Sequence, residues 1–97
     1  MRIPKTIKIG GIEYSIELVE EAKDEVNGAE YIGRVLFKEN KIKILSSYSE
    51  EKQYRTLLHE IIHVLDEDLK VGLEEKDICR LEVGLYQVLN DNKLLKE

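Results

Sequence analysis

The amino-acid sequence predicts a small α+β domain in which about four antiparallel strands come first and two helices follow. In the first half of the chain, short segments alternate apolar and polar residues, as strands with one buried face do. In the second half, two longer segments repeat apolar residues every three or four positions, as amphipathic helices do. The 97 residues suffice for one modest core, so residues 1–97 are expected to form a single domain.

Four short segments are predicted to be strands. The first two, residues 6–9 and 12–18, flank Gly10-Gly11, and two glycines readily accept the positive φ angles of a tight hairpin turn. A third strand is expected over residues 31–37, with Gly33 as a candidate bulge position. The fourth, residues 41–45, alternates lysine with apolar residues, which predicts an exposed edge strand.

The two helices are predicted over residues 50–69 and about 74–90. Ser47 and Ser49 are both candidate caps for the start of the first helix, and Gly72 is suited to its C-terminal end. Acidic residues occupy the first turn of the second helix, where they favour the helix dipole. Its apolar stripe is expected to contain Ile78, Leu81, Leu85, Val88 and Leu89.

Composition argues against several classes of protein. The formal net charge of −5, without a compensating basic run, argues against binding to nucleic acid. No apolar stretch approaches the ~20 residues that cross a bilayer, and the first residues do not resemble a signal peptide. A single cysteine, Cys79, fits a reducing cytoplasm, and its expected role is a small buried side chain.

The most informative motif is His59-Glu60-Ile61-Ile62-His63, an H-E-x-x-H segment inside the first predicted helix. Residues four apart lie on the same helix face, so the two imidazoles can bind one metal ion while Glu60 faces a water molecule. The chain contains only these two histidines, and the helical periodicity places them outside the main apolar stripe. Imidazole ligands at this spacing indicate Zn2+.

A catalytic zinc site usually has three protein ligands, so a third must come from elsewhere in the chain. No further histidine exists and Cys79 is not expected to be a ligand, which leaves a carboxylate. Asp66 shares the helix face of the histidines; Glu75 and Asp77 begin the second helix; and Glu82 lies beside its apolar stripe, where an unpaired charge would be costly. Spacing alone leaves the choice among these four residues open.

Residues 56–63, with the H-E-x-x-H motif, and residues 75–92, with a Gly-Leu-Tyr-Gln stretch, resemble small zincin-like proteins of bacteriophages and mobile elements. These are related to the ImmA/IrrE family of metallo-endopeptidases and to compact gluzincins. The resemblance implies a minimal zincin-like domain with zinc bound by His59, His63 and Glu75, and with Glu60 as the general base. It also implies a protein or peptide substrate, such as a phage or mobile-element regulator.

Four further hypotheses concern the function and partners of the chain. A peptide substrate is expected to add as a strand beside residues 41–45. A non-catalytic zinc-binding or protein-interaction module is the main alternative to a peptidase, and a metal-free structural protein is a third. A homodimer through the second helix, with Tyr86 and Leu94-Leu95 at the contact, is a separate hypothesis.

Overall fold

The computed structural model describes residues 3–20 and 32–95. Within these residues four strands precede two helices, which confirms the predicted α+β class. In chain order the elements are β1 (Thr6–Ile9), β2 (Ile12–Val19), β3 (Gly33–Leu36), the 3-10 turn η1 (Phe37–Glu39), β4 (Lys41–Leu45), α1 (Glu50–Leu69) and α2 (Glu75–Asp91).

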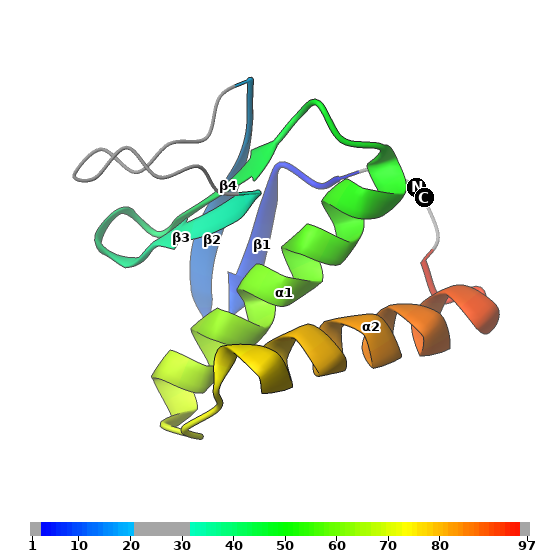
Figure 1. Cartoon of the computed structure of the whole chain (residues 1–97). Helices are drawn as coiled ribbons and strands as arrows, with labels where there is room; N and C mark the ends of the chain where they lie inside the picture. Colours follow the sequence, from blue (N-terminus) through cyan, green and yellow to red (C-terminus); the bar gives the residue numbers. More distant parts are fainter. Residues whose placement is uncertain (1–2, 21–31, 96–97) are drawn as a thin grey trace.

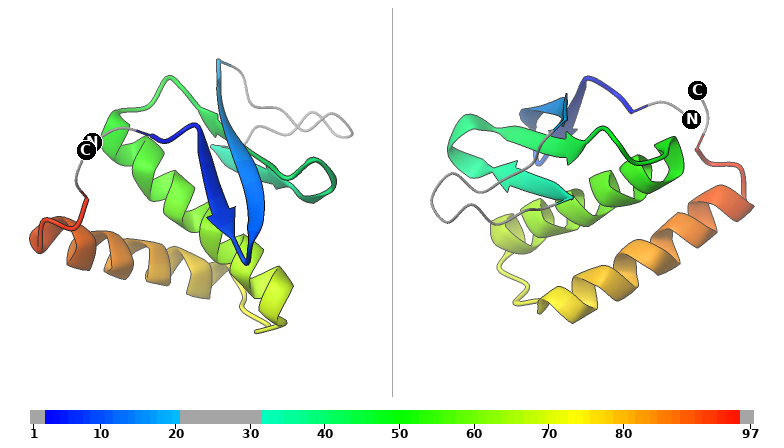
Figure 2. Two further views of the ribbon diagram at one scale, coloured as in Figure 1. Left: turned by 180° about the vertical axis from the view of Figure 1, so that it is seen from behind. Right: turned by 45° about the horizontal axis from the view of Figure 1, so that its top comes forward.

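The elements form three layers, with α1 between the sheet and α2 (Figure 1). The core lies between the sheet and α1. It consists of Ile9, Tyr14, Ile42, Ile44, Leu57 and Val64. Figure 2 shows the chain reversing direction between the two helices, so that α2 runs back along the side of α1 away from the sheet. Among the described residues, no helix combines the length and the apolar character needed to cross a bilayer.

The first predicted hairpin is confirmed. Strand β1 pairs antiparallel with β2, and Ile9 faces Ile12 across the turn. Gly10 and Gly11 have φ angles of 59° and 82°. Both angles lie in the left-handed region, which glycine enters without the steric penalty that a Cβ brings.

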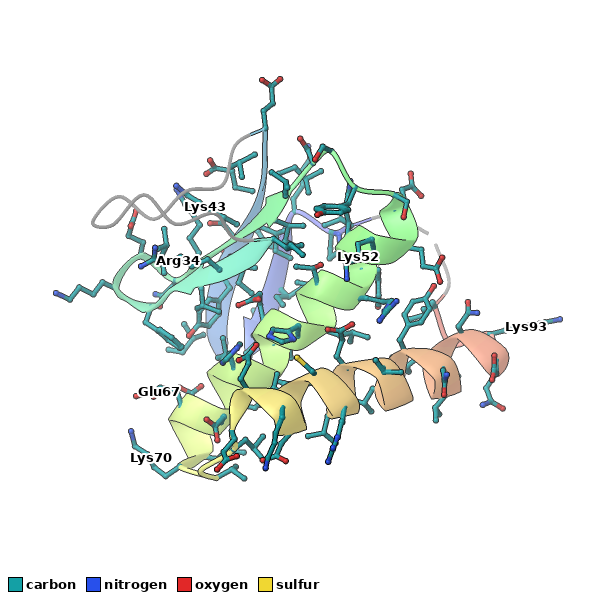
Figure 3. All side chains as sticks on the ribbon, in the orientation of Figure 1. Arg34, Lys43, Lys52, Glu67, Lys70 and Lys93 are labelled. Carbon is teal, nitrogen blue, oxygen red and sulfur yellow. The ribbon has the colours of Figure 1, made fainter. Side chains whose placement is uncertain are left out.

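The predicted edge position of residues 41–45 is wrong. The strand order is β1-β2-β4-β3, so β4 is an inner strand, parallel to β2 and antiparallel to β3. The sheet is therefore mixed rather than wholly antiparallel. The lysines alternate in β4 because Ile42 and Ile44 are fully buried against α1. Successive side chains of a strand point to opposite faces, so Lys41 and Lys43 lie on the other face of the sheet, as Figure 3 shows for Lys43.

Strand β3 is shorter than the predicted strand, and it is the edge strand next to β4 among the described strands. Tyr31 lies outside the described residues, and Phe37 begins the 3-10 turn. Gly33 pairs regularly with Ile44, so the expected bulge is absent from this position. The glycine instead permits close contact with α1, because a Cβ at this position would overlap the Thr56 methyl group.

Helix α1 has the predicted bounds, and Ser49, not Ser47, is its cap: the Ser49 hydroxyl accepts a hydrogen bond from the Lys52 amide at 3.2 Å. Its C-terminal left-handed residue is Lys70, with a φ of 54°, rather than Gly72. Gln53 holds the preceding loop in place, since its side-chain amide donates to the carbonyl oxygens of Ser46 and Tyr48.

Helix α2 buries only part of the predicted stripe: Ile78 is buried and Leu89 is half-buried, as expected, but the other three members are exposed. Ile78, Glu82 and Tyr86, spaced four residues apart, are its buried residues. Because α2 packs against a single helix, only a narrow face is covered; Leu81, Leu85 and Val88 remain 45%, 43% and 56% exposed. Tyr86 is buried and packs on Tyr54, with ring centroids 6.4 Å apart, whereas Leu94 is exposed; a homodimer through this helix stays a prediction.

Candidate metal centre

His59 and His63 lie one turn apart on α1, and a carboxylate of α2 reaches both of them. Their ring centroids are 4.9 Å apart. One oxygen of Glu75 lies 2.7 Å from His59 Nε2, and its other oxygen lies 3.0 Å from His63 Nε2. Of the four carboxylates proposed as a third ligand, Glu75 is therefore the one whose oxygens lie between the two imidazoles.

The turn between the helices brings Glu75 to this position, and Asp66 holds that turn. Its Oδ1 accepts hydrogen bonds from the backbone amides of Gly72 and Leu73, both at 2.9 Å. The carboxylate thus satisfies amides that follow α1, in the way that a cap does. Asp66, one of the four candidates for the third ligand, therefore directs its Oδ1 to the loop in this structure.

Asp77 also has a structural role. Its Oδ2 accepts a hydrogen bond from the Glu74 amide at 3.1 Å, and the Glu74 side chain completes a capping box at the start of α2. This reciprocal pairing fixes the first turn of α2 and hence the position of Glu75. Asp77, another candidate for the third ligand, therefore caps α2 in this structure.

Glu82 lies on the Nδ1 side of His59, whereas Glu75 lies on its Nε2 side. Its Oε1 is 3.2 Å from His59 Nδ1, and its Oε2 accepts a hydrogen bond from Arg55 Nε at 3.1 Å. The carboxylate is only 9% exposed, but its charge is paired, which removes the expected cost of an unpaired buried charge. A carboxylate at Nδ1 favours the tautomer that leaves Nε2 free to bind a metal, an arrangement typical of histidine ligands.

Glu60 is buried between α1 and β3. It is 6% exposed, and a Cβ at Gly33 would lie 3.2 Å from its Oε2. Burial raises the pKa of Glu60 to about 7; His59 opposes this increase, and the negative charges of Glu75 and Glu82 add to it. A carboxyl group that titrates near neutral pH is suited to proton transfer.

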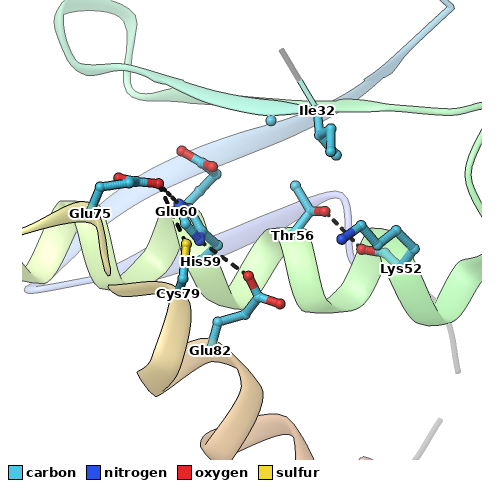
Figure 4. Close-up of a pocket in the computed structure, with 9 residues that line it drawn as sticks. Ile32, Lys52, Thr56, His59, Glu60, Glu75, Cys79 and Glu82 are labelled. Carbon is cyan, nitrogen blue, oxygen red and sulfur yellow. Dashed lines mark hydrogen bonds and ion pairs between the residues drawn. The ribbon is translucent and has the colours of Figure 1, made fainter. Parts of the chain in front are cut away.

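Two adjoining hollows open on this group of residues. One, of about 370 Å³, is lined by His59, Glu60, Cys79 and their neighbours (Figure 4). The other, of about 290 Å³, is bordered by His63 and by the β3 edge from Gly33 to Val35. His59 and Glu60 line both hollows, so a ligand in either one would contact them.

Cys79 lies in this site and is exposed, so the expectation of a small buried side chain is wrong. Its Sγ is 4.0 Å from Glu75 Oε1. Neighbouring side chains remove water from part of the thiol and raise its pKa, and the charges of Glu75 and Glu82 raise it further. The sequence signal was the spacing of Glu75 and Cys79, which lie four residues apart and so share one helix face.

The donor atoms suit a divalent metal ion. Two imidazole nitrogens and a carboxylate form the ligand set of many catalytic zinc sites. A second group of donor atoms, one from each of His59, Glu75 and Cys79, lies within 4.8 Å of one another. Glu75 contacts both histidines through its two oxygens, so modest side-chain rotations would allow these residues to share one ion.

Comparisons of the chain with protein-family models, with curated proteins and with solved structures gave no match.

Proposed function

We propose that this protein is a zinc-dependent metallopeptidase of the zincin type, in which His59, His63 and Glu75 bind the metal and Glu60 is the general base. The observation that carries the proposal is the position of Glu75, whose two oxygens lie 2.7 Å and 3.0 Å from Nε2 of the two histidines. Among the described residues, Glu60 caps no helix and forms no ion pair that would explain a buried carboxylate beside them.

The chemistry follows from these positions. Zinc bound at such a site supplies Lewis acidity and lowers the pKa of water from 15.7 to roughly 7. Glu60, with a pKa of about 7 in the metal-free protein, can accept a proton from water and return it to the leaving amine. Glu82 orients His59 through Nδ1, and Arg55 in turn holds Glu82.

The proposed substrate is an extended peptide that adds to β3. Because β4 is an inner strand, β3 offers the open edge next to the site among the described strands. Gly33, Arg34 and Val35 of this strand border the same hollow as His63 and Glu60. Strand addition there would place a peptide carbonyl near the histidines without a side chain at Gly33 in the way.

The cysteine content of the chain also bears on the cellular setting. The single, exposed Cys79 fits a reducing compartment, which we take to be the cytoplasm. The resemblance to zincin-like proteins of phages and mobile elements suggests a regulatory protein as the substrate. This last step rests on family analogy alone.

A peptide-cleavage assay tests the proposed activity. The zinc-loaded wild type is incubated with a peptide library whose products are identified by mass spectrometry, in parallel with Glu60→Gln and, as a control, Glu13→Gln on the exposed part of β2. Cleavage is expected for the wild type and Glu13→Gln, and its loss for Glu60→Gln. A chelator should stop cleavage, and added zinc should restore it. Equal cleavage by Glu60→Gln would refute the role of Glu60 as the base.

One observation favours a second candidate, a non-catalytic zinc module. The Cys79 sulfur, 4.0 Å from Glu75 Oε1, offers a fourth protein ligand, and structural zinc sites are closed by four. Stoichiometric zinc binding without cleavage of any library peptide, by the wild type or by Cys79→Ser, would favour this candidate over a peptidase.

A further inference from the structure

The single cysteine of the chain lies beside the proposed metal ligands. Cys79 follows Glu75 by one turn of α2, so both side chains point from the same face of α2 toward His59 (Figure 4). Donor atoms of His59, Glu75 and Cys79 lie within 4.8 Å of one another. Three different types of metal-binding side chain, from two helices, thus converge on one small volume.

The spacing suits a shared ion. Zinc–sulfur bonds are about 2.3 Å long and zinc–nitrogen bonds about 2.0–2.1 Å, so ligand atoms around one tetrahedral zinc ion lie roughly 3 to 4 Å apart. The 4.0 Å between Cys79 Sγ and Glu75 Oε1 falls at the end of that range. His63 is not among these three residues, but its Nε2 lies 3.0 Å from the other oxygen of Glu75, so Glu75 links His63 to the group.

Other common roles of cysteine fit this position poorly. Cys79 is exposed, so it does not fill the core. As the only cysteine in the chain, it has no partner for an internal disulfide. The carboxylates of Glu75 and Glu82 line the same hollow as the thiol, and a bound cation would offset their negative charge.

We propose that Cys79 is a fourth protein ligand of the metal centre formed by His59, His63 and Glu75. This inference rests on the proposed function for those three ligands. With the thiolate bound, the centre is closed; the sulfur occupies the position that a catalytic zinc site keeps for water. Water or a peptide would then have to displace Cys79 from the metal before cleavage.

Spectroscopy of the cobalt-substituted protein tests the inference directly. Wild type, Cys79→Ser and, as a matched α2 control, Leu81→Ser are reconstituted with Co2+, and bound cobalt is measured by elemental analysis. A sulfur-to-cobalt charge-transfer band in the near ultraviolet is expected for the wild type and Leu81→Ser and is expected to be absent from Cys79→Ser. Circular dichroism confirms that each variant is folded.

Thiol reactivity gives an independent readout, because every modified thiol must be Cys79. Zinc is expected to slow alkylation of the wild type by iodoacetamide by about tenfold or more, since a metal-bound thiolate is a weaker nucleophile. This protection should be lost in His63→Ala. Cobalt binding without the charge-transfer band, together with equal alkylation rates with and without zinc, would overturn the role of Cys79 and leave the proposed function intact. A wild type that binds no cobalt would overturn both.

Discussion

Replacing Glu60 with glutamine is expected to stabilise the metal-free protein at and above neutral pH. The pKa of Glu60 is raised from 4.5 to about 7, chiefly because the side chain is buried. The wild type therefore folds most favourably with a neutral Glu60 and must bury an anion above pH 7. Glutamine has nearly the same shape and carries no charge, so it removes this penalty while leaving the packing against β3 in place.

The magnitude follows from the two pKa values. A difference of one in pKa corresponds to about 1.4 kcal/mol, so a rise from 4.5 to about 7 gives roughly 3.5 kcal/mol as an upper bound. Because the pKa in the folded state is the higher one, this stability is fully present below pH 4.5 and is lost as the pH rises through 7. Between these pH values the wild type should lose up to roughly 3.5 kcal/mol relative to Glu60→Gln.

Urea denaturation in the presence of a chelator, from pH 4.5 to 8.5, measures this difference. Glu13→Gln serves as the control, since it removes one exposed carboxylate from β2. The curves of wild type and Glu60→Gln should converge at the acid end and separate toward pH 8. If the two proteins differ by the same free energy at every pH, burial does not raise the pKa of Glu60, and the proton-transfer argument loses its main support.

Three other substitutions have distinct expected effects. Gly33→Ala should lower the free energy of unfolding by about 1–3 kcal/mol in urea denaturation, because the added Cβ overlaps the Thr56 methyl group. Thr56→Ser in the same chain removes that methyl group and should recover part of the loss; additive effects of the two substitutions would contradict the contact. Glu82→Gln should weaken zinc affinity about 10- to 100-fold in titration calorimetry by loosening His59, and an unchanged affinity would remove its orienting role. Asp66→Ala should lower stability by about 1–2 kcal/mol without changing zinc affinity, whereas loss of zinc would identify it as a ligand after all.

Local patterns in the sequence predicted the individual elements well. The glycine pair specified the β1–β2 turn because its positive φ angles are a property of the residues themselves. The helical repeat gave the bounds of α1, since i to i+4 spacing depends on nothing outside the helix. For the same reason, placing His59 and His63 on one helix face required no knowledge of the tertiary structure.

Features that depend on which elements meet were predicted less well. The alternating pattern of β4 indicates that one face of the strand is buried. The pattern does not indicate whether neighbouring strands pair with both of its edges, so the lysines predict an edge strand although β4 is an inner strand. On α2, apolar Leu81 and Leu85 were expected inside, yet the chain buries Glu82, because Arg55 and His59 of α1 pair with it.

The candidate site shows the same division. The H-E-x-x-H motif marked three residues directly, while the choice among Asp66, Glu75, Asp77 and Glu82 depended on how α2 crosses α1. Asp66, Asp77 and Glu82 each have another role in the structure. Asp66 binds amides of the loop between the helices, Asp77 caps α2, and Glu82 forms an ion pair with Arg55. Partners of this kind are set by tertiary packing and leave no distinctive spacing in the sequence.

Zinc stoichiometry tests most directly whether His59, His63 and Glu75 form a metal centre. Each protein is stripped of metal, dialysed against zinc and then against buffer, and analysed for metal, with Asp77→Asn as the control at the start of α2. Wild type and Asp77→Asn should retain equimolar zinc, and His63→Ala and Glu75→Gln should retain little. A wild type without zinc, or a Glu75→Gln variant that binds as much zinc as the wild type, would contradict the proposed centre.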